Sequence, residues 1–291
     1  MAETWFKSLK RLHRQRKQQT ELGSAVSHFE RAINNNTDTI PVLVVSYNNG
    51  VYVQNIVLQL QRFGITPIII DNCSQDPDTI RLLGKIQRDG SAQVIVCNKN
   101  FGHSVGFLEP IYRLLPEVFA YTDPDIEFSP RLPVNFLSVL AELTVQFSVF
   151  KAGFALSLTA DEILLDTLIG CSTYKPFSFQ KTFSISEWES KFWRMQLMHN
   201  SLEVYAAEID TTFAVYRKIN YRGNFLDAVR VAGDYSAIHL PWFPRLDIMS
   251  DQQKMRYLDR NKSTSWVRAR QGAPADCSAS ATPRRWANRH E

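Results

Sequence analysis

The middle of the chain carries the run Phe119-Ala120-Tyr121-Thr122-Asp123-Pro124-Asp125-Ile126. Its first half is apolar and aromatic, as in a buried strand, and two carboxylates then follow on either side of one proline. On a strand, residues i and i+2 point to the same face, so Asp123 and Asp125 are expected to converge on one object. Pro124 has no amide donor, which predicts that the strand ends here. Carboxylates placed this way are typical ligands of a divalent cation that carries phosphate.

Three apolar runs upstream end in polar residues in the same way. They are short, rich in β-branched residues and nearly free of polar ones, as expected for strands buried on both faces of a parallel sheet. The runs are residues 40–45, followed by Ser46, Tyr47 and Asn48; residues 67–70, followed by Asp71 and Asn72; and residues 94–96, followed by Cys97 and Asn98.

The segments between these runs have helical patterns. Apolar residues recur at helical spacing from Val53 to Leu60, and Asp76 followed by Pro77 provides a cap and a first-turn residue for a second helix. A third helix is expected over residues 104–115. Strands that alternate with helices predict an open α/β sheet with right-handed crossovers, whose ligands bind at the carboxyl ends of the strands.

Four motifs follow one another at regular intervals. They are Pro-Val-Leu-Val-Val-Ser-Tyr-Asn at 41–48, Ile-Ile-Asp-Asn-Cys-Ser at 69–74, Asn-Lys-Asn-Phe-Gly-His-Ser-Val-Gly-Phe at 98–107 and Thr-Asp-Pro-Asp at 122–125. In this order they resemble the glycosyltransferases of the GT-A fold, in particular family 2, over residues 38–245. The resemblance implies a Rossmann-like, mostly parallel sheet flanked by helices, and transfer of a sugar from a nucleotide-sugar donor.

The resemblance also implies a donor site at the strand ends. Residues after the first two strands would hold the base and ribose, and the glycine-containing loop would let the backbone approach the sugar and diphosphate. The residues so assigned are Ser46, Tyr47, Asn48, Asp71, Asn100, Gly102, His103 and Asp123. Two simpler interpretations stay open: Asp71 as a turn or cap residue, and the loop as an ordinary strand-to-helix turn. The chain lacks the glycine patterns of dinucleotide-binding and P-loop proteins in this loop.

A metal site is expected at Asp123 and Asp125, with Mn²⁺ or Mg²⁺ as the cofactor, because hard cations prefer oxygen ligands. The resemblance adds His239, since many GT-A enzymes return a C-terminal histidine to the metal. A histidine in an apolar setting is also consistent with a hydrogen-bonded core residue.

The second half is expected to supply the acceptor site and the catalytic base. Strands are predicted over residues 151–158 and 209–216, and a helix capped by Ser186 is predicted to begin between them. In inverting GT-A enzymes a carboxylate at the start of such a helix accepts the proton of the acceptor hydroxyl, and Glu189 fits that position. Simple complementarity to the helix dipole is the alternative. Asp210 is the rival base, because an acid in an apolar strand needs a partner or a function.

The ends of the chain differ in charge from its middle. Residues 1–20 and residues 260–291 each carry net +5, and the remainder carries −6. Apolar residues at helical spacing among the basic ones of residues 1–20 indicate a helix on an anionic membrane surface, with a solvated or partner-binding helix as the alternative. The expected organisation is a basic helical segment at 1–37, a catalytic domain at 38–250 and a basic, partly disordered tail at 251–291.

The sequence also bears on where the protein is located and which partners it binds. It has no apolar run that could span a bilayer, no signal-peptide pattern and no disulfide or metal spacing among its four cysteines, which favours the cytoplasm with peripheral attachment to the inner face of the cell membrane. No nucleic-acid recognition module accompanies the basic ends, so no nucleic-acid partner is expected.

These expectations combine into one function. The chain is predicted to be a metal-dependent, inverting glycosyltransferase that moves a sugar, most simply from a UDP-sugar, to a hydroxyl of a cell-surface glycan or its lipid-linked precursor. An inactive scaffold of the same fold in polysaccharide assembly is one alternative. A sugar nucleotidyltransferase is another, although residues 46–50 lack the glycine-rich basic loop that such an enzyme would need after the first strand.

Overall fold

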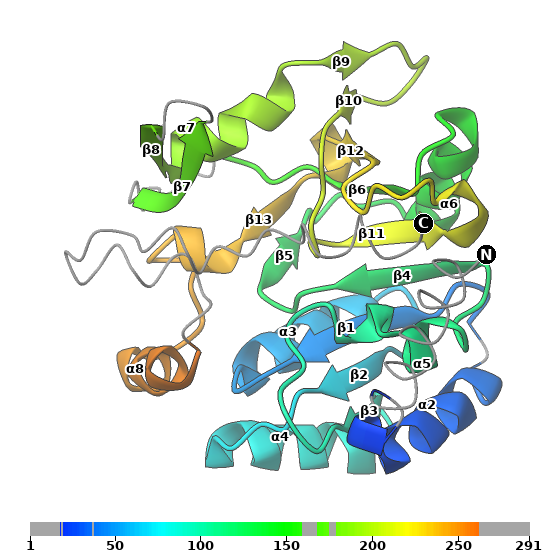
Figure 1. Cartoon of the computed structure of the whole chain (residues 1–291), viewed down its shortest axis with the longest axis vertical. Coiled ribbons are helices and arrows are strands. Elements are labelled where there is room, and N and C mark those ends of the chain that lie inside the picture. Colours follow the sequence, from blue (N-terminus) through cyan, green and yellow to red (C-terminus); the bar gives the residue numbers. More distant parts are fainter. Residues whose placement is uncertain (1–17, 19, 37, 159–167, 175–178, 262–291) are drawn as a thin grey trace, which may run out of the picture. The chain divides into compact units, whose positions relative to one another are not determined.

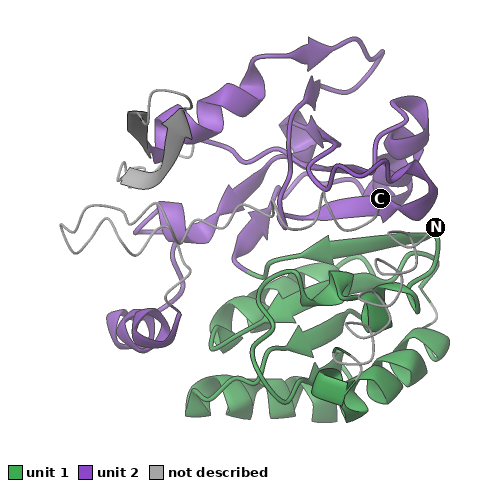
Figure 2. Cartoon of the chain, viewed as in Figure 1, with its two compact units in different colours: residues 1–124 green, residues 125–291 purple. Residues whose placement is uncertain are grey.

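The computed structural model describes residues 18, 20–36, 38–158, 168–174 and 179–261 (Figure 1). The chain divides into two compact units, residues 1–124 and residues 125–291 (Figure 2). The fold is mixed α/β with a mostly parallel sheet flanked by helices, as the sequence predicted.

The strands of the first unit form a parallel sheet in the order β3-β2-β1-β4. β1 and β2 are buried along their whole length, whereas the edge strand β3 is partly exposed. The strands are β1 (Val42–Ser46), β2 (Ile68–Asp71), β3 (Gln93–Val96) and β4 (Val118–Thr122). The four predicted strands are therefore confirmed, within two residues at each end.

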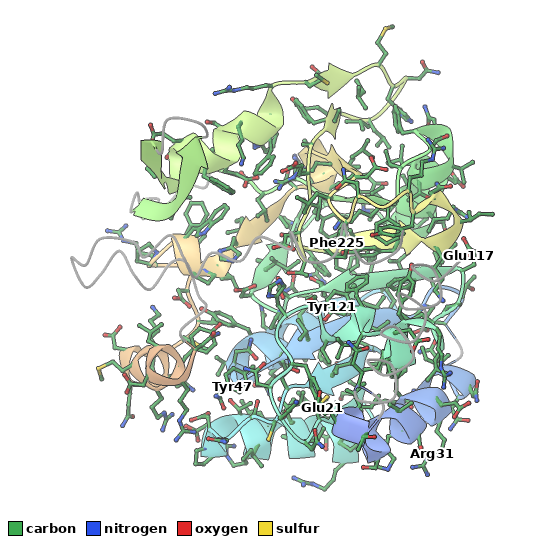
Figure 3. All side chains as sticks on the ribbon, viewed as in Figure 1. Glu21, Arg31, Tyr47, Glu117, Tyr121 and Phe225 are labelled. Atoms are coloured by element: carbon green, nitrogen blue, oxygen red, sulfur yellow. The ribbon has the colours of Figure 1, made fainter. Side chains whose placement is uncertain are left out.

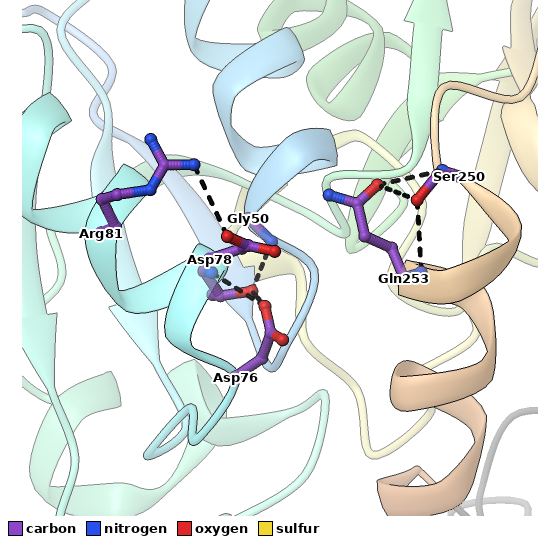
Figure 4. Close-up of polar contacts among 7 residues, drawn as sticks. Gly50, Asp76, Asp78, Arg81, Ser250 and Gln253 are labelled. Carbon is purple, nitrogen blue, oxygen red and sulfur yellow. Dashed lines mark hydrogen bonds and ion pairs between the residues drawn. The ribbon is translucent and has the colours of Figure 1, made fainter.

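One helix precedes β1 and the other helical elements connect the strands of this unit. They are α2 (Ser24–Asn34), α3 (Gly50–Gln61), α4 (Pro77–Arg88), the 3₁₀ turn η1 (Val105–Phe107) and α5 (Glu109–Tyr112). The predicted cap of α4 is confirmed, since the Asp76 carboxylate accepts the Thr79 amide at 2.9 Å (Figure 4). The predicted helix over residues 104–115 is wrong, because the segment is broken at the extended residue Leu108. Pro110 accounts for the break, since its ring would clash with the carbonyl four residues earlier in a continuous helix.

α2 packs its apolar side into the first unit. Phe29 and Val26 are buried, Gln93 of β3 donates to the Ala32 carbonyl at 3.4 Å, and Lys99 pairs with Glu21 at 3.0 Å. The part of the predicted basic helix at residues 1–17 lies outside the described residues, as does the tail from residue 262 onward. Among the helices that the structure describes, none is long and apolar enough to cross a membrane.

The second unit has a mixed sheet in the order β11-β6-β12-β10-β9, in which only β6 and β12 pair in parallel. β5 pairs with β13 and β7 with β8, both antiparallel. The strands are β5 (Ile126–Phe128), β6 (Lys151–Phe154), β7 (Leu168–Tyr174), β8 (Phe179–Ser184), β9 (Gln196–Leu197), β10 (Val204–Ala206), β11 (Ala214–Arg217), β12 (Ala228–Val231) and β13 (Ala237–His239).

Two strand predictions in this unit were too long. The segment predicted at 151–158 is a strand only as far as Phe154, after which Leu156 makes a single isolated bridge. The segment predicted at 209–216 becomes a strand only at Ala214. The carbonyl of Asp210 accepts hydrogen bonds from the Lys151 ammonium and the Tyr216 hydroxyl, so side chains occupy the carbonyl that a strand would use in its ladder.

The remaining helical elements of the second unit are mostly short. They are α6 (Phe136–Gln146), α7 (Ile185–Ser190), η2 (Lys191–Trp193), η3 (Lys218–Asn220), η4 (Gly233–Tyr235), η5 (Leu240–Trp242) and α8 (Asp251–Arg260). Arg217 donates to the Ala141 carbonyl within α6 at 3.2 Å, and Asn220 donates to the Thr144 carbonyl in the last turn of α6 at 2.7 Å, so both side chains tie this helix to the end of β11 and to η3. α8 begins with a capping box between Ser250 and Gln253 (Figure 4).

An aromatic core supports this second sheet. The rings of Phe154 and Phe213 stack with centroids 4.7 Å apart, and Phe128 and Phe136 pack around them. A side chain at Gly153 would bring its Cβ within 2.2 Å of the Phe213 carbonyl oxygen. Only glycine therefore allows β6 and β11 to approach this closely.

Candidate functional site

The carboxyl ends of β1 and β2 lie side by side, because Ser46 is paired with Asp71 in the parallel register. The Ser46 hydroxyl donates to the Asn49 side-chain oxygen at 3.2 Å, and the Tyr47 amide donates to the same oxygen at 3.1 Å. Tyr47 follows β1 directly and is labelled at that end of the strand in Figure 3. Ser46, Tyr47 and Asp71 thus gather at the edge where the sequence predicted them.

Asn48 links the loop after β1 to the loop after β2. Its backbone is left-handed, with φ of 53°, and its side-chain oxygen accepts the amides of Gln75 at 2.7 Å and Asp76 at 2.9 Å. Its own amide donates to the Ser74 hydroxyl at 2.8 Å. The Nδ2 group of Asn48 is buried and has no hydrogen-bond partner. A buried amide donor without a partner is unusual in a folded protein. Because Asn48 Nδ2 is buried, a carbonyl or phosphate oxygen of a ligand would reach it only after the surrounding loop moved.

Asp71 is 2% exposed and closes its own turn. Its carboxylate accepts the Ser74 amide at 2.9 Å and the Ser74 hydroxyl at 2.5 Å. Burial raises the pKa of Asp71, and its hydrogen bonds with Ser74 and Ser46 lower it in part. These contacts agree with the turn interpretation of Asp71, and its contact with a nucleoside stays a prediction.

The loop after β3 exposes its tip and buries its end. Gly102 and His103 are exposed, whereas Val105 and Phe107 are buried. The Gly102 backbone has φ of 89°, and its amide donates to the Asn100 side chain at 2.8 Å. A left-handed backbone of this kind favours glycine, which accounts for the residue at this position.

The acidic run lies in a connection and not on a strand. β4 ends at Thr122 and β5 begins at Ile126, so strand alternation does not orient Asp123 and Asp125, and that premise of the sequence analysis was wrong. The break at Pro124 agrees with its missing amide donor. Asp123 belongs to the first unit and Asp125 to the second.

In the second unit, Asp125 lies next to His239. β5 and β13 pair antiparallel with His239 opposite Ile126, and the Leu240 amide donates to the Asp125 carbonyl at 2.9 Å. The His239 Nε2 atom is 3.3 Å from Asp125 Oδ2, with the two side chains 18% and 16% exposed. The Trp242 ring covers the imidazole, with centroids 4.6 Å apart. Two residues 114 positions apart in the chain are therefore in contact.

Each side chain of this pair keeps one buried atom without a partner, Asp125 Oδ1 and His239 Nδ1. Burial raises the pKa of Asp125, but the charge and hydrogen bond of His239 outweigh burial and leave that pKa below its usual range. A carboxylate oxygen and an imidazole nitrogen suit Mn²⁺. No group of three or more acidic, histidine or cysteine side chains arranged for a metal occurs among the described residues, so phosphate and water would have to complete the shell.

α7 begins two residues earlier than predicted. Ser184, and not Ser186, is its cap: the Ser184 hydroxyl accepts the Glu187 amide at 3.2 Å, and the Glu187 carboxylate accepts the Ser184 amide at 3.0 Å. Glu187 therefore completes a capping box. Glu189, one turn further into the helix than this cap, is left to point inward and is 2% exposed.

Glu189 forms a buried ion pair with Arg230 of β12. Arg230 also donates from Nε to the Glu208 carbonyl at 2.8 Å, and its guanidinium lies 4.0 Å from the centre of the Phe192 ring. Burial raises the pKa of Glu189, while the charges of Arg230 and His239 act in the opposite direction. The predicted base and the predicted metal ligand His239 are thus close enough to interact electrostatically.

Asp210 is exposed and lies in the loop before β11, so the argument that an apolar strand buries it was wrong. Its carbonyl, and not its carboxylate, is the group bound by the Lys151 ammonium at 2.8 Å. The charge of the Asp210 carboxylate acts to raise the pKa of Lys151.

Four residues around these sites were missed by sequence reasoning: Asn72, Tyr121, Lys151 and Arg230. Lys151 carried a usable signal, since it is a charged residue in the strand predicted at 151–158 and therefore required a partner. Arg230 lies in the buried strand β12, where a charged residue has the same requirement. Asn72 and Tyr121 are close in sequence to predicted site residues, but no sequence feature indicated that they support a loop.

The parallel strands and the loops at their carboxyl ends define a mixed α/β protein with a candidate ligand site in its first unit and an acid–histidine pair in its second. No protein-family model and no curated protein matches the chain. Among solved structures, it is similar to the mannosyltransferase PcManGT from Pyrobaculum calidifontis in complex with GDP-Man and Mn²⁺. The two chains share 10% identity with a TM-score of 0.40, over 88% of this chain and 74% of the other. A likeness this distant assigns no activity to this chain.

Proposed function

We propose that the chain is a metal-dependent glycosyltransferase that moves a sugar from a nucleotide-sugar donor, most simply a UDP-sugar, to a hydroxyl of a cell-surface glycan or its lipid-linked precursor. The observation that carries the proposal is the contact between Asp125 and His239. Many GT-A enzymes, which the sequence resembles, return a late histidine to the acidic motif, and here the two residues in contact are 114 positions apart in the chain.

Binding of the nucleoside and of the diphosphate-sugar is assigned to the first unit. Ser46, Tyr47, Asn48 and Asp71 lie at the carboxyl ends of β1 and β2, where ligands of open α/β sheets bind. The loop containing Asn100, Gly102 and His103 follows β3 at the same edge. Asp71 would meet the ribose only after its turn with Ser74 adjusts, because both of its oxygens accept bonds within that turn.

Asp125 and His239 are assigned to the metal, and Asp123 stays a ligand expected from the sequence alone, because the described residues do not group it with that pair. The unpartnered Asp125 Oδ1 and His239 Nδ1 atoms are the donors that support this assignment. When bound there, Mn²⁺ or Mg²⁺ would neutralise charge on the departing nucleoside diphosphate. Asp125 must be ionised and His239 neutral to bind the metal, so the charge of the cation would replace the charge of His239 that lowers the pKa of Asp125.

The transfer step needs a base for the acceptor hydroxyl. The acceptor oxygen forms a bond to the anomeric carbon as the bond to the phosphate oxygen breaks, the leaving diphosphate takes the electron pair, and the hydroxyl proton passes to a carboxylate. Glu189 is the favoured carboxylate, because burial raises its pKa and so makes it a better proton acceptor. The exposed Asp210 is the alternative. Direct displacement of this kind inverts the anomeric centre.

The membrane proposal concerns the ends of the chain. Residues 1–20 carry net +5, which suits an anionic lipid surface and an acceptor anchored in lipid. This part of the proposal does not depend on the donor site.

A calorimetric titration tests the donor site. The purified chain is titrated with UDP, GDP, CDP and ADP and with their common sugar conjugates, once with Mn²⁺ and once with chelator. Binding of one nucleotide class that needs the metal is the expected result. Metal-independent binding of all four nucleotides would contradict the metal assignment, and the absence of binding across the panel would favour an inactive scaffold of this fold.

A further inference from the structure

The loop between β3 and η1 is held at its start by one buried side chain. Asn72, which follows β2, is 1% exposed. Its Nδ2 donates to the Gly102 carbonyl at 2.9 Å, and its Oδ1 accepts the Phe101 amide at 3.2 Å. The Asn72 side chain therefore binds the two peptide groups on either side of the Phe101–Gly102 peptide, one through its N–H and the other through its carbonyl. The backbone of Phe101 and Gly102 is therefore positioned by a neighbouring strand and not by the loop itself.

The other end of the loop is held by Tyr121, on β4 (Figure 3). Its hydroxyl donates to the His103 carbonyl at 2.6 Å and accepts the Gly106 amide at 3.4 Å. A Cβ atom at Gly106 would lie 2.4 Å from the Tyr121 ring, so glycine is required for this approach. The Tyr121 ring is itself fixed by Phe107, with centroids 4.8 Å apart.

These two side chains are rigid supports beneath an exposed tip. Tyr121 and Asn72 are buried, whereas Asn100, Gly102 and His103 are exposed. Left to itself, a loop with a left-handed glycine would sample many backbone conformations, and each residue that is ordered only on binding costs about 1–2 kcal/mol. The two supports remove that cost before any ligand arrives.

We propose that Asn72 and Tyr121 are positioning residues that hold the backbone of residues 101–106 in the conformation that receives the diphosphate-sugar. This inference rests on the proposed function and adds to it two residues that contact no ligand themselves. They act through the Gly102 and His103 carbonyls that they bind. Their contribution is to affinity for the nucleotide, because preorganisation lowers the cost of binding.

Two variants and one control test the inference. Asn72→Ala removes both hydrogen bonds at the start of the loop, and Tyr121→Phe removes only the hydroxyl while its ring stays beneath Gly106. Ile86→Val is the control, since Ile86 is buried on α4, outside residues 101–106, and its truncation costs about 1 kcal/mol of stability. All three are made in the full chain.

Two measurements are made on each variant. Amide hydrogen exchange without ligand reports on the loop, and calorimetry with UDP and Mn²⁺ reports on affinity. We expect exchange of the Phe101 amide to accelerate at least about tenfold in Asn72→Ala and that of the Gly106 amide to accelerate in Tyr121→Phe. The Kd for UDP should rise about tenfold in both. In Ile86→Val both quantities should stay within about twofold of those of the unchanged chain.

The outcomes separate this inference from the proposed function. If the unchanged chain binds UDP and both variants bind it equally well despite faster exchange, the inference is overturned and the donor site stands. Unchanged exchange in both variants would also overturn it, because the supports would then not hold the loop. If the unchanged chain binds no nucleotide, the proposed function fails first and the inference fails with it. An equal loss of affinity in Ile86→Val would show that general stability, and not loop position, controls binding.

Discussion

Lys151 is fully buried at the start of β6, and it illustrates how single residues determine the pH dependence of this fold. Its ammonium lies 3.8 Å from the centre of the Phe225 ring and donates to the Asp210 carbonyl. Burial lowers the pKa of Lys151 from 10.5 to about 7, although the charge of Asp210 acts in the opposite direction. The folded chain therefore holds this amine neutral at pH values where the unfolded chain protonates it.

The sign of the effect follows from proton counting. Between pH 7 and pH 10.5 the unfolded state binds more protons than the folded state, so the free energy of unfolding rises with pH. The destabilisation caused by burying Lys151 is fully present below pH 7. We expect Lys151→Met to stabilise the protein at pH 7, by at most about 5 kcal/mol. The gain should shrink towards zero near pH 10.5. Urea unfolding of both chains at several pH values measures it, and two parallel curves would contradict the assignment.

Substitutions in the buried ion pair of Glu189 and Arg230 can distinguish an effect on stability from an effect on catalysis. Removing one partner leaves an unpaired buried charge, which costs about 3–5 kcal/mol, whereas replacing both with apolar residues of similar size is often neutral. We expect Glu189→Leu to destabilise the protein and the double variant with Arg230→Met to recover most of the loss.

Activity gives the other half of this experiment. If Glu189 is the base, the double variant should be as stable as the unchanged chain in thermal unfolding and still transfer no sugar. A double variant that is both folded and active would leave Asp210 as the candidate base. Asp210→Asn is the matching single variant for that case, because Asp210 is exposed and its removal should cost little stability.

At the scale of elements, α3 and α4 begin against each other. The Gly50 amide donates to the Thr79 hydroxyl at 3.1 Å (Figure 4), and a Cβ at Gly50 would lie 2.7 Å from the Thr79 Cα atom. By contrast, a Cβ at Gly84 inside α4 would meet only the flexible end of Arg88, at 3.3 Å. The same substitution should therefore have opposite effects at the two sites.

We expect Gly50→Ala to destabilise the protein by about 1–3 kcal/mol, because backbone must shift to make room. Gly84→Ala should stabilise it by about 0.5–1 kcal/mol, because alanine restricts the unfolded chain and favours the helix. Denaturant unfolding of the two variants checks both signs. Equal effects would mean that α3 and α4 are not packed as described.

The elements differ in how far the sequence predicted them, and the reasons are physical. β1 and β2 are buried on both faces, so uninterrupted β-branched runs mark them clearly. The helix expected at 104–115 failed because Pro110 lies inside it, a signal that the apolar spacing concealed. The strand expected at 209–216 failed because a side chain from elsewhere, Lys151, takes the Asp210 carbonyl. Local pattern cannot reveal a contact between residues 59 positions apart.

The same limit applies to the candidate site. The order of the motifs predicted that Ser46 and Asp71 lie side by side, because parallel pairing brings successive strand ends together. It did not predict that Glu189 meets Arg230, or that Asn72 supports the loop after β3. The contact of His239 with Asp125 came from the resemblance alone, since no local pattern relates the two residues.

At the scale of the whole molecule, charge is concentrated at the ends of the chain. Residues 1–20 carry six Lys and Arg against one Glu. Deleting residues 1–20 should therefore weaken binding to vesicles that contain anionic lipid, with a larger effect at low salt. Co-sedimentation measures it, with neutral vesicles as the control, and unchanged binding would remove the membrane proposal.

The central claim is that Asp125, paired with His239, holds the metal to which the nucleoside diphosphate binds. The measurement that tests it most directly is the calorimetric affinity for the nucleotide identified by the panel, with Mn²⁺, in the unchanged chain and in Asp125→Asn. The substitution keeps the shape and a hydrogen-bonding group beside His239 and removes only the charge. The account predicts the same folded protein by thermal unfolding and an affinity weaker by at least about tenfold, or about 1.4 kcal/mol. Equal Mn²⁺-dependent affinity in the two chains would contradict it.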